Sequence, residues 1–153
     1  MKYQLPLLNG NGDIYVPFSS KEKTESIVLT HDNFSVLSKF THLEEHYEFN
    51  ANIYIPREQL IADEDCTVTI RPELLLHGEA VDVSLIEEPT IIIRSRDLDG
   101  YSSVKYVKDF KLRNDRESTY TFNVPKRLRK LEISVSGMVK NLNSGEKQDL
   151  LVK

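Results

Sequence analysis

The chain of 153 residues lacks tryptophan and has a single cysteine, Cys66. One cysteine excludes an internal disulfide. No apolar run approaches the roughly 18 residues needed to cross a bilayer, so we predict no membrane insertion. The first residues, MKYQLPLLNGNG, hold one lysine and too short an apolar stretch for a signal peptide. The sequence therefore predicts either a cytosolic chain or a piece of a larger protein. At the C-terminal end KQDLLVK stops in mid-pattern, without a closing polar tail, which favours a piece of a larger protein.

Sequence motifs of common catalytic sites are also missing. The chain has no glycine-rich phosphate loop, no Gly-x-Ser-x-Gly elbow and no pair of cysteines. Cys66 alternates with Val68 and Ile70 in CTVTI, which favours a small buried side chain over a reactive thiol. We predict a protein that is not an enzyme and uses no cofactor.

Charge is distributed unevenly along the chain. Residues 1–100 carry 8 basic and 18 acidic side chains, a net charge of −10, whereas residues 101–153 carry 12 and 6, a net charge of +6. Two interpretations are open. Either the signs interleave once the strands fold together, or the molecule is bipolar and docks electrostatically against its neighbours. Because the whole chain is acidic, at −4, it would repel phosphate, and we predict no nucleic-acid partner.

Alternation of apolar and polar residues predicts β-strands along most of the chain. The clearest stretch is HYEFNANIYIP, where one face would carry Tyr47, Phe49, Ala51, Ile53 and Ile55. In LEISVSGMV the shared face would carry Leu131, Ile133, Val135, Gly137 and Val139. The same period appears in CTVTIRP, AVDVSLI, YSSVKYV and STYTFNV, and more weakly in DIYVPF and ESIVLT. The continuous run PTIIIRS predicts a strand that is buried on both faces.

Turn residues separate the predicted strands. The turns are Asn9-Gly10-Asn11-Gly12, Asp99-Gly100 and Asn143-Ser144-Gly145. All six prolines fall near predicted strand ends, where a missing amide hydrogen costs little. PREQLIADED (56–65) and VPKRLRKL (124–131) could each form one short helical turn. About eight to ten short strands predict an all-β, antiparallel β-sandwich, in a single domain over residues 1–153.

The stretch THLEEH has the spacing of an inverted zinc-protease motif, His42-x-x-Glu45-His46. Histidines four residues apart share a metal only on a helix, where one turn brings both rings to the same side. On a strand the same spacing is about 13 Å, too long for a shared zinc. Strict alternation from Tyr47 onward leaves too little room for a helix. We therefore reject His42 and His46 as metal ligands and predict a charged loop or strand lead-in.

Three further clusters resemble chemical sites but fit ordinary surface better. RDLDG (96–100) resembles the start of a calcium loop, yet the third acidic ligand and the closing glutamate are missing, so we expect a turn. Glu87-Glu88 and Asp63-Glu64-Asp65 could be read as acid/base pairs. Their carboxylates are adjacent in sequence, and we expect them to be solvated.

The predicted binding segment is a basic stretch that follows Pro125. It places Lys126, Arg127, Arg129 and Lys130 within five residues. These cations would contact an acidic surface on a protein partner or on a neighbouring domain of the same chain. The alternative is a charged connection between strands, with Leu128 packed inward.

Carbohydrate binding, as an accessory domain of a hydrolase, is the alternative function. Exposed aromatic side chains bind sugars in many sandwich folds, and Tyr54 and Tyr101 are the candidates in this chain. The absence of tryptophan, the strongest stacking residue, weakens this alternative. We therefore predict a protein partner and no small-molecule ligand.

Two stretches resemble strands of macroglobulin-type and other immunoglobulin-like β-sandwich modules. They are YIPREQL (54–60) and LEISVSGMVKNL (131–142). The thioester and bait elements of the macroglobulins are absent, so protease trapping does not carry over. The resemblance implies an immunoglobulin-like sandwich with a structural or interaction role inside a longer polypeptide, located outside the cell or on its surface.

Overall fold

A computed structural model describes residues 16, 19, 21–108 and 110–153. The chain divides into two compact units: Met1–Glu45 with Leu142–Gly145, and His46–Asn141 with Glu146–Lys153. We call them the hairpin unit and the sandwich unit. The predicted strand DIYVPF, apart from Val16, and the predicted turn at residues 9–12 lie outside the described residues.

The hairpin unit contains two antiparallel strands, β1 (Lys23–His31) and β2 (Phe34–His42). β1 confirms the weaker prediction at ESIVLT, whereas β2 was not predicted. The two-residue turn between them places Asp32 at a φ of 51°, a left-handed conformation that aspartate tolerates better than most residues.

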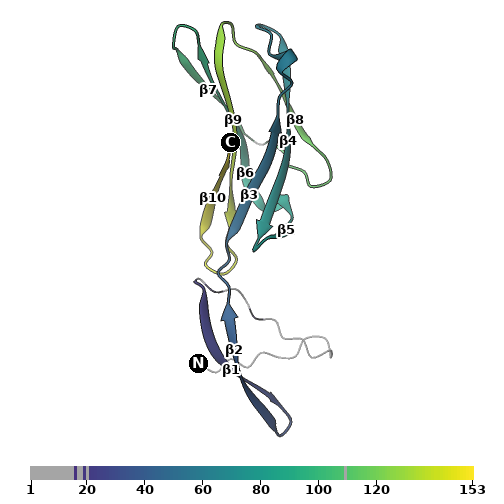
Figure 1. The fold of residues 1–153 in the computed structure, drawn as a ribbon, viewed down its shortest axis with the longest axis vertical. Coiled ribbons are helices and arrows are strands. Elements are labelled where there is room, and N and C mark those ends of the chain that lie inside the picture. Colours follow the sequence, from purple (N-terminus) through teal and green to yellow (C-terminus); the bar gives the residue numbers. More distant parts are fainter. Residues whose placement is uncertain (1–15, 17–18, 20, 109) are drawn as a thin grey trace. The chain divides into compact units, whose positions relative to one another are not determined.

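The sandwich unit consists of two antiparallel sheets that face each other (Figure 1). The first sheet has the order β10 (Lys147–Val152), β9 (Leu128–Lys140), β6 (Ile86–Asp97) and β7 (Ser102–Val107). The second contains β3 (Tyr47–Tyr54), β4 (Asp65–Leu76), β5 (Glu79–Val81) and β8 (Ser118–Asn123). Both β5 and β8 pair with β4, at different parts of its length. The predicted all-β antiparallel sandwich is confirmed.

Apolar residues of both sheets meet between them and form the core. Cys66, Val68 and Ile70 of β4 are fully buried, as the alternation in CTVTI predicts. In β6 the run Ile91–Ile93 is buried on both faces of its sheet, with exposures of 0, 8 and 6%. The inward side chains of β3 and β9 also match the prediction. Burial in an apolar core stabilises each such side chain by about 1.5–3 kcal/mol.

One predicted strand has different bounds in the structure. AVDVSLI is not one strand, because β5 ends at Val81 and a 3₁₀ helix, η2 (Val83–Leu85), follows. The carboxylate of Asp82 accepts a hydrogen bond of 2.8 Å from the backbone N–H of Ser84, an N-cap contact that a strand would not allow.

The prediction that every proline lies near a strand end is also wrong. β4 continues past Pro72 to Leu76, and β6 contains Pro89. β6 accommodates Pro89 through a β-bulge between Glu87 and Thr90.

Helix is scarce in the described residues. PREQLIADED forms the 3₁₀ helix η1 (Arg57–Gln59), as predicted. VPKRLRKL forms no helical turn. Lys126 and Arg127 make a tight turn instead, with Arg127 at a φ of 54°, and β9 begins at the next residue. Neither helix in the described part of the chain approaches the length or apolar character needed to cross a membrane.

Candidate interaction surfaces

The predicted basic stretch is divided by local ion pairs. Lys126 Nζ lies 3.2 Å from Asp63 Oδ2, and Arg127 Nη2 lies 2.9 Å from Asp99 Oδ1. Both pairs are exposed, and exposed pairs contribute only about 0–1 kcal/mol to stability. Lys126 and Arg127 therefore link the turn before β9 to the loops that carry Asp63 and Asp99.

The other two cations of the stretch lie in β9. A register shift between Arg96 and Asp97 interrupts the alternation of side chains at Arg129, and both Arg129 and Lys130 are exposed. Lys130 is the cross-strand partner of Arg96 in β6, on the face of the sheet that points away from the core. The structure thus brings Lys130 together with residues far from it in sequence.

We call the resulting surface the basic face, made of Arg94, Arg96, Lys130 and Lys153. Glu132 lies among its cations, with its carboxylate oxygens 3.6 Å from Arg94 Nη1, 3.5 Å from Lys130 Nζ and 3.9 Å from Lys153 Nζ. The carboxylate of Glu132 therefore forms ion pairs with three cations. Sequence reasoning missed Arg94 and Arg96, because only the register of β6 against β9 places them beside Lys130 and Glu132. It also missed Lys153, which follows β10 and approaches Glu132.

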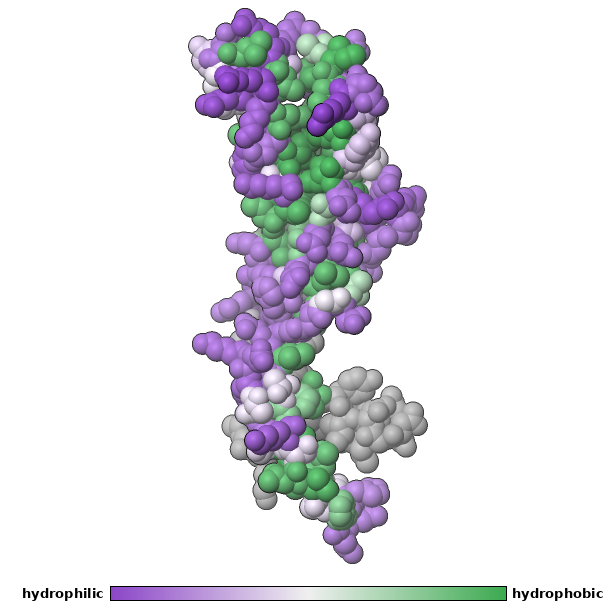
Figure 2. Space-filling view, in the orientation of Figure 1, coloured by the Kyte–Doolittle hydropathy of each residue, from purple (hydrophilic) through white to green (hydrophobic). Residues whose placement is uncertain are grey.

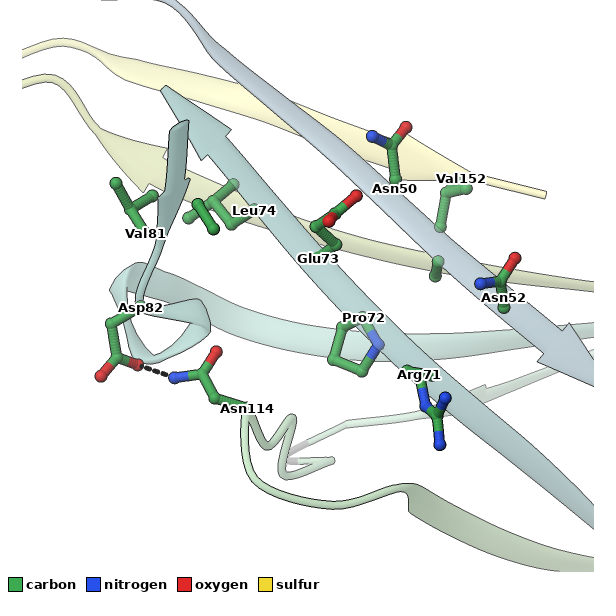
Figure 3. Close-up of a pocket in the computed structure, with 12 residues that line it drawn as sticks. Asn50, Asn52, Arg71, Pro72, Glu73, Leu74, Val81, Asp82, Asn114 and Val152 are labelled. Carbon is green, nitrogen blue, oxygen red and sulfur yellow. Dashed lines mark hydrogen bonds between the residues drawn. The ribbon is translucent and has the colours of Figure 1, made fainter. Parts of the chain in front are cut away.

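A polar groove of about 860 Å³ lies over β3, β4 and β5 (Figure 3). It is located where residues 71–73 of β4 pair with neither β5, which begins its pairing at Leu74, nor β8, which ends its pairing at Ile70. In Figure 3, Asn50 and Asn52 project from β3, and Arg71 and Glu73 from β4.

The charged side chains of the groove are largely engaged in contacts that build the fold. Arg71 Nη2 donates to Glu117 Oε1 at 3.0 Å, and Asn114 Nδ2 donates to Asp82 Oδ1 at 2.7 Å. Hydrogen bonds from the backbone and side chain of Ser84, and from Asn114, lower the pKa of Asp82. The contacts of Asp82 and Asn114 attach the segment before β8 to η2.

The His-x-x-Glu-His stretch is extended rather than helical. His42 ends β2, where its Nε2 lies 3.5 Å from Glu25 Oε2, and His46 belongs to the other compact unit. The carboxylate of Glu45, buried to 4% exposure, accepts hydrogen bonds of 2.9 Å from the backbone N–H groups of Leu142 and Asn143. Glu45 thus holds the turn 142–145 in the hairpin unit, a role that no sequence pattern indicated.

No group of three or more His, Cys, Asp or Glu side chains is placed to hold a metal ion in the part of the chain that the structure describes. The calcium-like stretch RDLDG is a turn, in which Asp97 Oδ1 accepts hydrogen bonds of 2.9 Å from the N–H groups of Asp99 and Tyr101. Burial raises the pKa of the Cys66 thiol, which keeps it protonated and unreactive.

The two acidic clusters form surface ion pairs and turns. Glu87 Oε2 lies 2.8 Å from Lys147 Nζ, and this cation lowers the pKa of Glu87. Asp63 pairs with Lys126, as described above. The candidate sugar-binding tyrosines are exposed, at 61% for Tyr54 and 78% for Tyr101, but Tyr54 ends β3 and Tyr101 precedes β7, in different sheets.

Comparison with known proteins places this sandwich in a family. Actin-binding protein F of Dictyostelium discoideum is 32% identical over 150 residues. The aligned region covers 94% of this chain and 6% of that protein, so the chain spans a small part of its relative. No solved structure matches the chain significantly. The family described as AbpF third immunoglobulin-like domain matches residues 56–153. The chain therefore belongs to the family of AbpF third immunoglobulin-like domains.

Proposed function

We propose that the chain is a non-enzymatic structural and interaction module of a larger, actin-associated protein. The observation that carries this proposal is the match of residues 56–153 to an immunoglobulin-like domain, found in a relative that is named for actin binding. A module that corresponds to 6% of its relative is expected to work beside other domains. That residues 1–153 form one such module stays a prediction, as does the narrower likeness to macroglobulin modules.

The proposed contact surface is the basic face, together with the cations of the stretch 126–130. Arg96 and Lys130 are like charges directly opposite each other in neighbouring strands, an arrangement that is unfavourable in isolation. An acidic surface of another protein would relieve this repulsion. Such contacts steer association and give it specificity more than they add affinity.

Co-sedimentation with actin filaments tests the proposal. We expect the purified chain to pellet with filaments at low salt, and to pellet less as salt screens the exposed charges over about 10 Å at 0.1 M. The double variant Arg96→Glu with Lys130→Glu should lose most of this binding. Lys21→Glu with Lys39→Glu, which reverses two exposed cations of the hairpin unit, is the matched control and should bind normally.

Absence of filament-dependent pelleting at every salt concentration would contradict a direct contact with actin. Equal loss in the control variant would show that net charge, rather than the basic face, determines binding. No second function is proposed, because the two tyrosines that could bind a sugar belong to different sheets.

A further inference from the structure

The outward face of the first sheet carries apolar side chains at its β7 edge. Val107 of β7 packs against the core, so alternation along the strand turns Val104 and Tyr106 away from it. These two side chains are exposed to 47 and 60%. Tyr106 is the cross-strand partner of Ile92 in β6, which lies on the same face. We call Ile92, Val104 and Tyr106 the apolar patch.

The apolar patch adjoins the basic face. Val104 is the cross-strand partner of Arg94, which belongs to the basic face. Two residues further along β6, Arg96 pairs with Lys130 of β9. The outward surface of this sheet therefore changes from apolar at Tyr106 to basic at Arg96 and Lys130.

The outward face of the second sheet is different. Its side chains are mostly polar, as at Asn50 and Asn52 of β3 and Thr67 and Thr69 of β4. An antiparallel sheet that faces water on one side normally carries polar residues there. Figure 2 shows this usual distribution over the sandwich unit, with a hydrophobic strip where the two sheets meet and hydrophilic residues on both sides. The apolar patch departs from it, and exposed apolar side chains with a polar rim are typical of contact sites.

We propose that the apolar patch and the basic face together bind an amphipathic helix of a partner protein, whose apolar side is bordered by acidic residues. β6 is paired along one edge with β7 and along the other with β9, so this face offers side chains and no main-chain pairing. A helix satisfies its own backbone hydrogen bonds and needs only side-chain contacts. This inference deepens the proposed function and rests on it, because it states which element of the partner contacts the basic face.

The side chains of the face define the chemistry of that helix. The four cations of the basic face surround one carboxylate, that of Glu132, so positive charge is in excess. Acidic residues at the border of the helix would contact these cations, and apolar residues three and four positions apart would pack on Val104 and Tyr106. Tyrosine is among the residues that contribute most to binding at protein interfaces, so Tyr106 is the expected anchor.

NMR titration of the full 153-residue chain with a helical peptide tests the inference. The peptide has about 18 residues, long enough to form a helix in water, with leucines on one side and glutamates along the borders of that side. We expect the methyl signals of Ile92 and Val104 and the ring signals of Tyr106 to shift. A peptide of the same composition, with its leucines distributed around the helix, is the matched control and should not bind.

Three results of this titration would overturn the assignment. They are shifts confined to the second sheet, equal binding of the control peptide, and signals of the apolar patch that depend on protein concentration without peptide. The last result would mean that a second copy of the chain, rather than a partner helix, covers the patch.

Two tyrosine variants separate docking on this face from nonspecific attraction. Tyr106→Ser should weaken peptide binding by about ten-fold, the effect of removing an interface tyrosine. Tyr54→Ser is the matched control and should change nothing, because Tyr54 is exposed to 61% on the outward face of the other sheet. Both side chains are exposed, so both variants should fold. Equal weakening by the two variants, or unchanged binding in Tyr106→Ser, would contradict the inference.

The two proposals fail separately. If the peptide does not bind but the chain pellets with actin filaments, only the helix contact is excluded. If the peptide shifts the signals of the apolar patch but the chain does not pellet, the helix contact stands and the contact with actin fails.

Discussion

β1 of the hairpin unit alternates much as the strands of the sandwich unit do, but among the described residues only the sandwich buries its apolar side chains. In the hairpin, Val28, Phe34 and Leu37 are exposed to 64, 69 and 72%. In the sandwich, Val68, Ile91 and Val135 are exposed to 0%. The described residues of the hairpin unit provide no second layer for β1 and β2, and two strands alone are marginally stable in water. Two facing sheets, in contrast, exclude water from between them. Alternation therefore predicts a strand, but not its burial.

The largest expected effect comes from truncating the sandwich core. Ile91→Ala should lower the free energy of unfolding by about 2–5 kcal/mol, because it leaves a cavity among closely packed side chains. Val28→Ala in the hairpin removes apolar atoms that are already exposed. It should change the free energy of unfolding by no more than about 0.5 kcal/mol. Urea unfolding of both variants measures this contrast. Similar losses would show that the hairpin shares the core's cooperativity.

A close contact between the backbone of β9 and β6 gives a second test of how tightly the sandwich unit is packed. A Cβ added at Gly137 would overlap Cγ2 of Ile86, and would also approach the backbone of Glu87. We therefore expect Gly137→Ala to cost about 1–3 kcal/mol through overpacking. Ser136→Ala is the control, because it changes the preceding residue, whose side chain lies on the outward face of β9. It should lower the free energy of unfolding less than Gly137→Ala does, as measured by thermal unfolding. If Gly137→Ala left the free energy of unfolding unchanged, β6 and β9 could move apart freely at this point.

Within the hairpin unit, we expect a polar contact to matter more than apolar ones. Glu45→Ala would leave the N–H groups of Leu142 and Asn143 without the carboxylate that accepts from them. Each such loss costs about 1–3 kcal/mol when the groups remain buried, so these two amides should exchange hydrogen faster. Glu44→Ala, which removes the neighbouring exposed carboxylate, is the control. If hydrogen exchange at Leu142 and Asn143 were unchanged in Glu45→Ala, the carboxylate of Glu45 would not stabilise this turn.

The smallest effect concerns a surface ion pair. Lys147 lowers the pKa of Glu87, so the pair's contribution is present above the ordinary glutamate pKa and disappears as pH falls through the lowered value. An NMR titration of the Glu87 carboxyl should show a higher pKa in Lys147→Gln and no change in Lys153→Gln. Because the pair is exposed, unfolding free energy should hardly depend on it. A clear loss of stability in Lys147→Gln would contradict this.

Local patterns in the sequence were sufficient to predict most of the sandwich. The run PTIIIRS and the alternation in CTVTI give the buried positions of β6 and β4, because burial on a strand follows side-chain parity. β2 was missed because Phe34 and Leu37 place apolar side chains on opposite faces of the hairpin, so that its pattern is not a simple alternation.

The basic face could not be predicted from local patterns. Arg96 and Lys130 are neighbours only through the register of β6 against β9, which includes two irregularities, between Glu87 and Thr90 and between Arg96 and Asp97. A one-residue slip moves every side chain to the other face.

Native-state hydrogen exchange over the whole chain tests the central claim most directly. That claim is that the sandwich unit is the stable module, because its two sheets bury a shared apolar core. We predict the strongest protection in β6 and in residues 135–140 of β9, and exchange by local opening in β1 and β2. Equal protection in the hairpin and the sandwich would contradict the account.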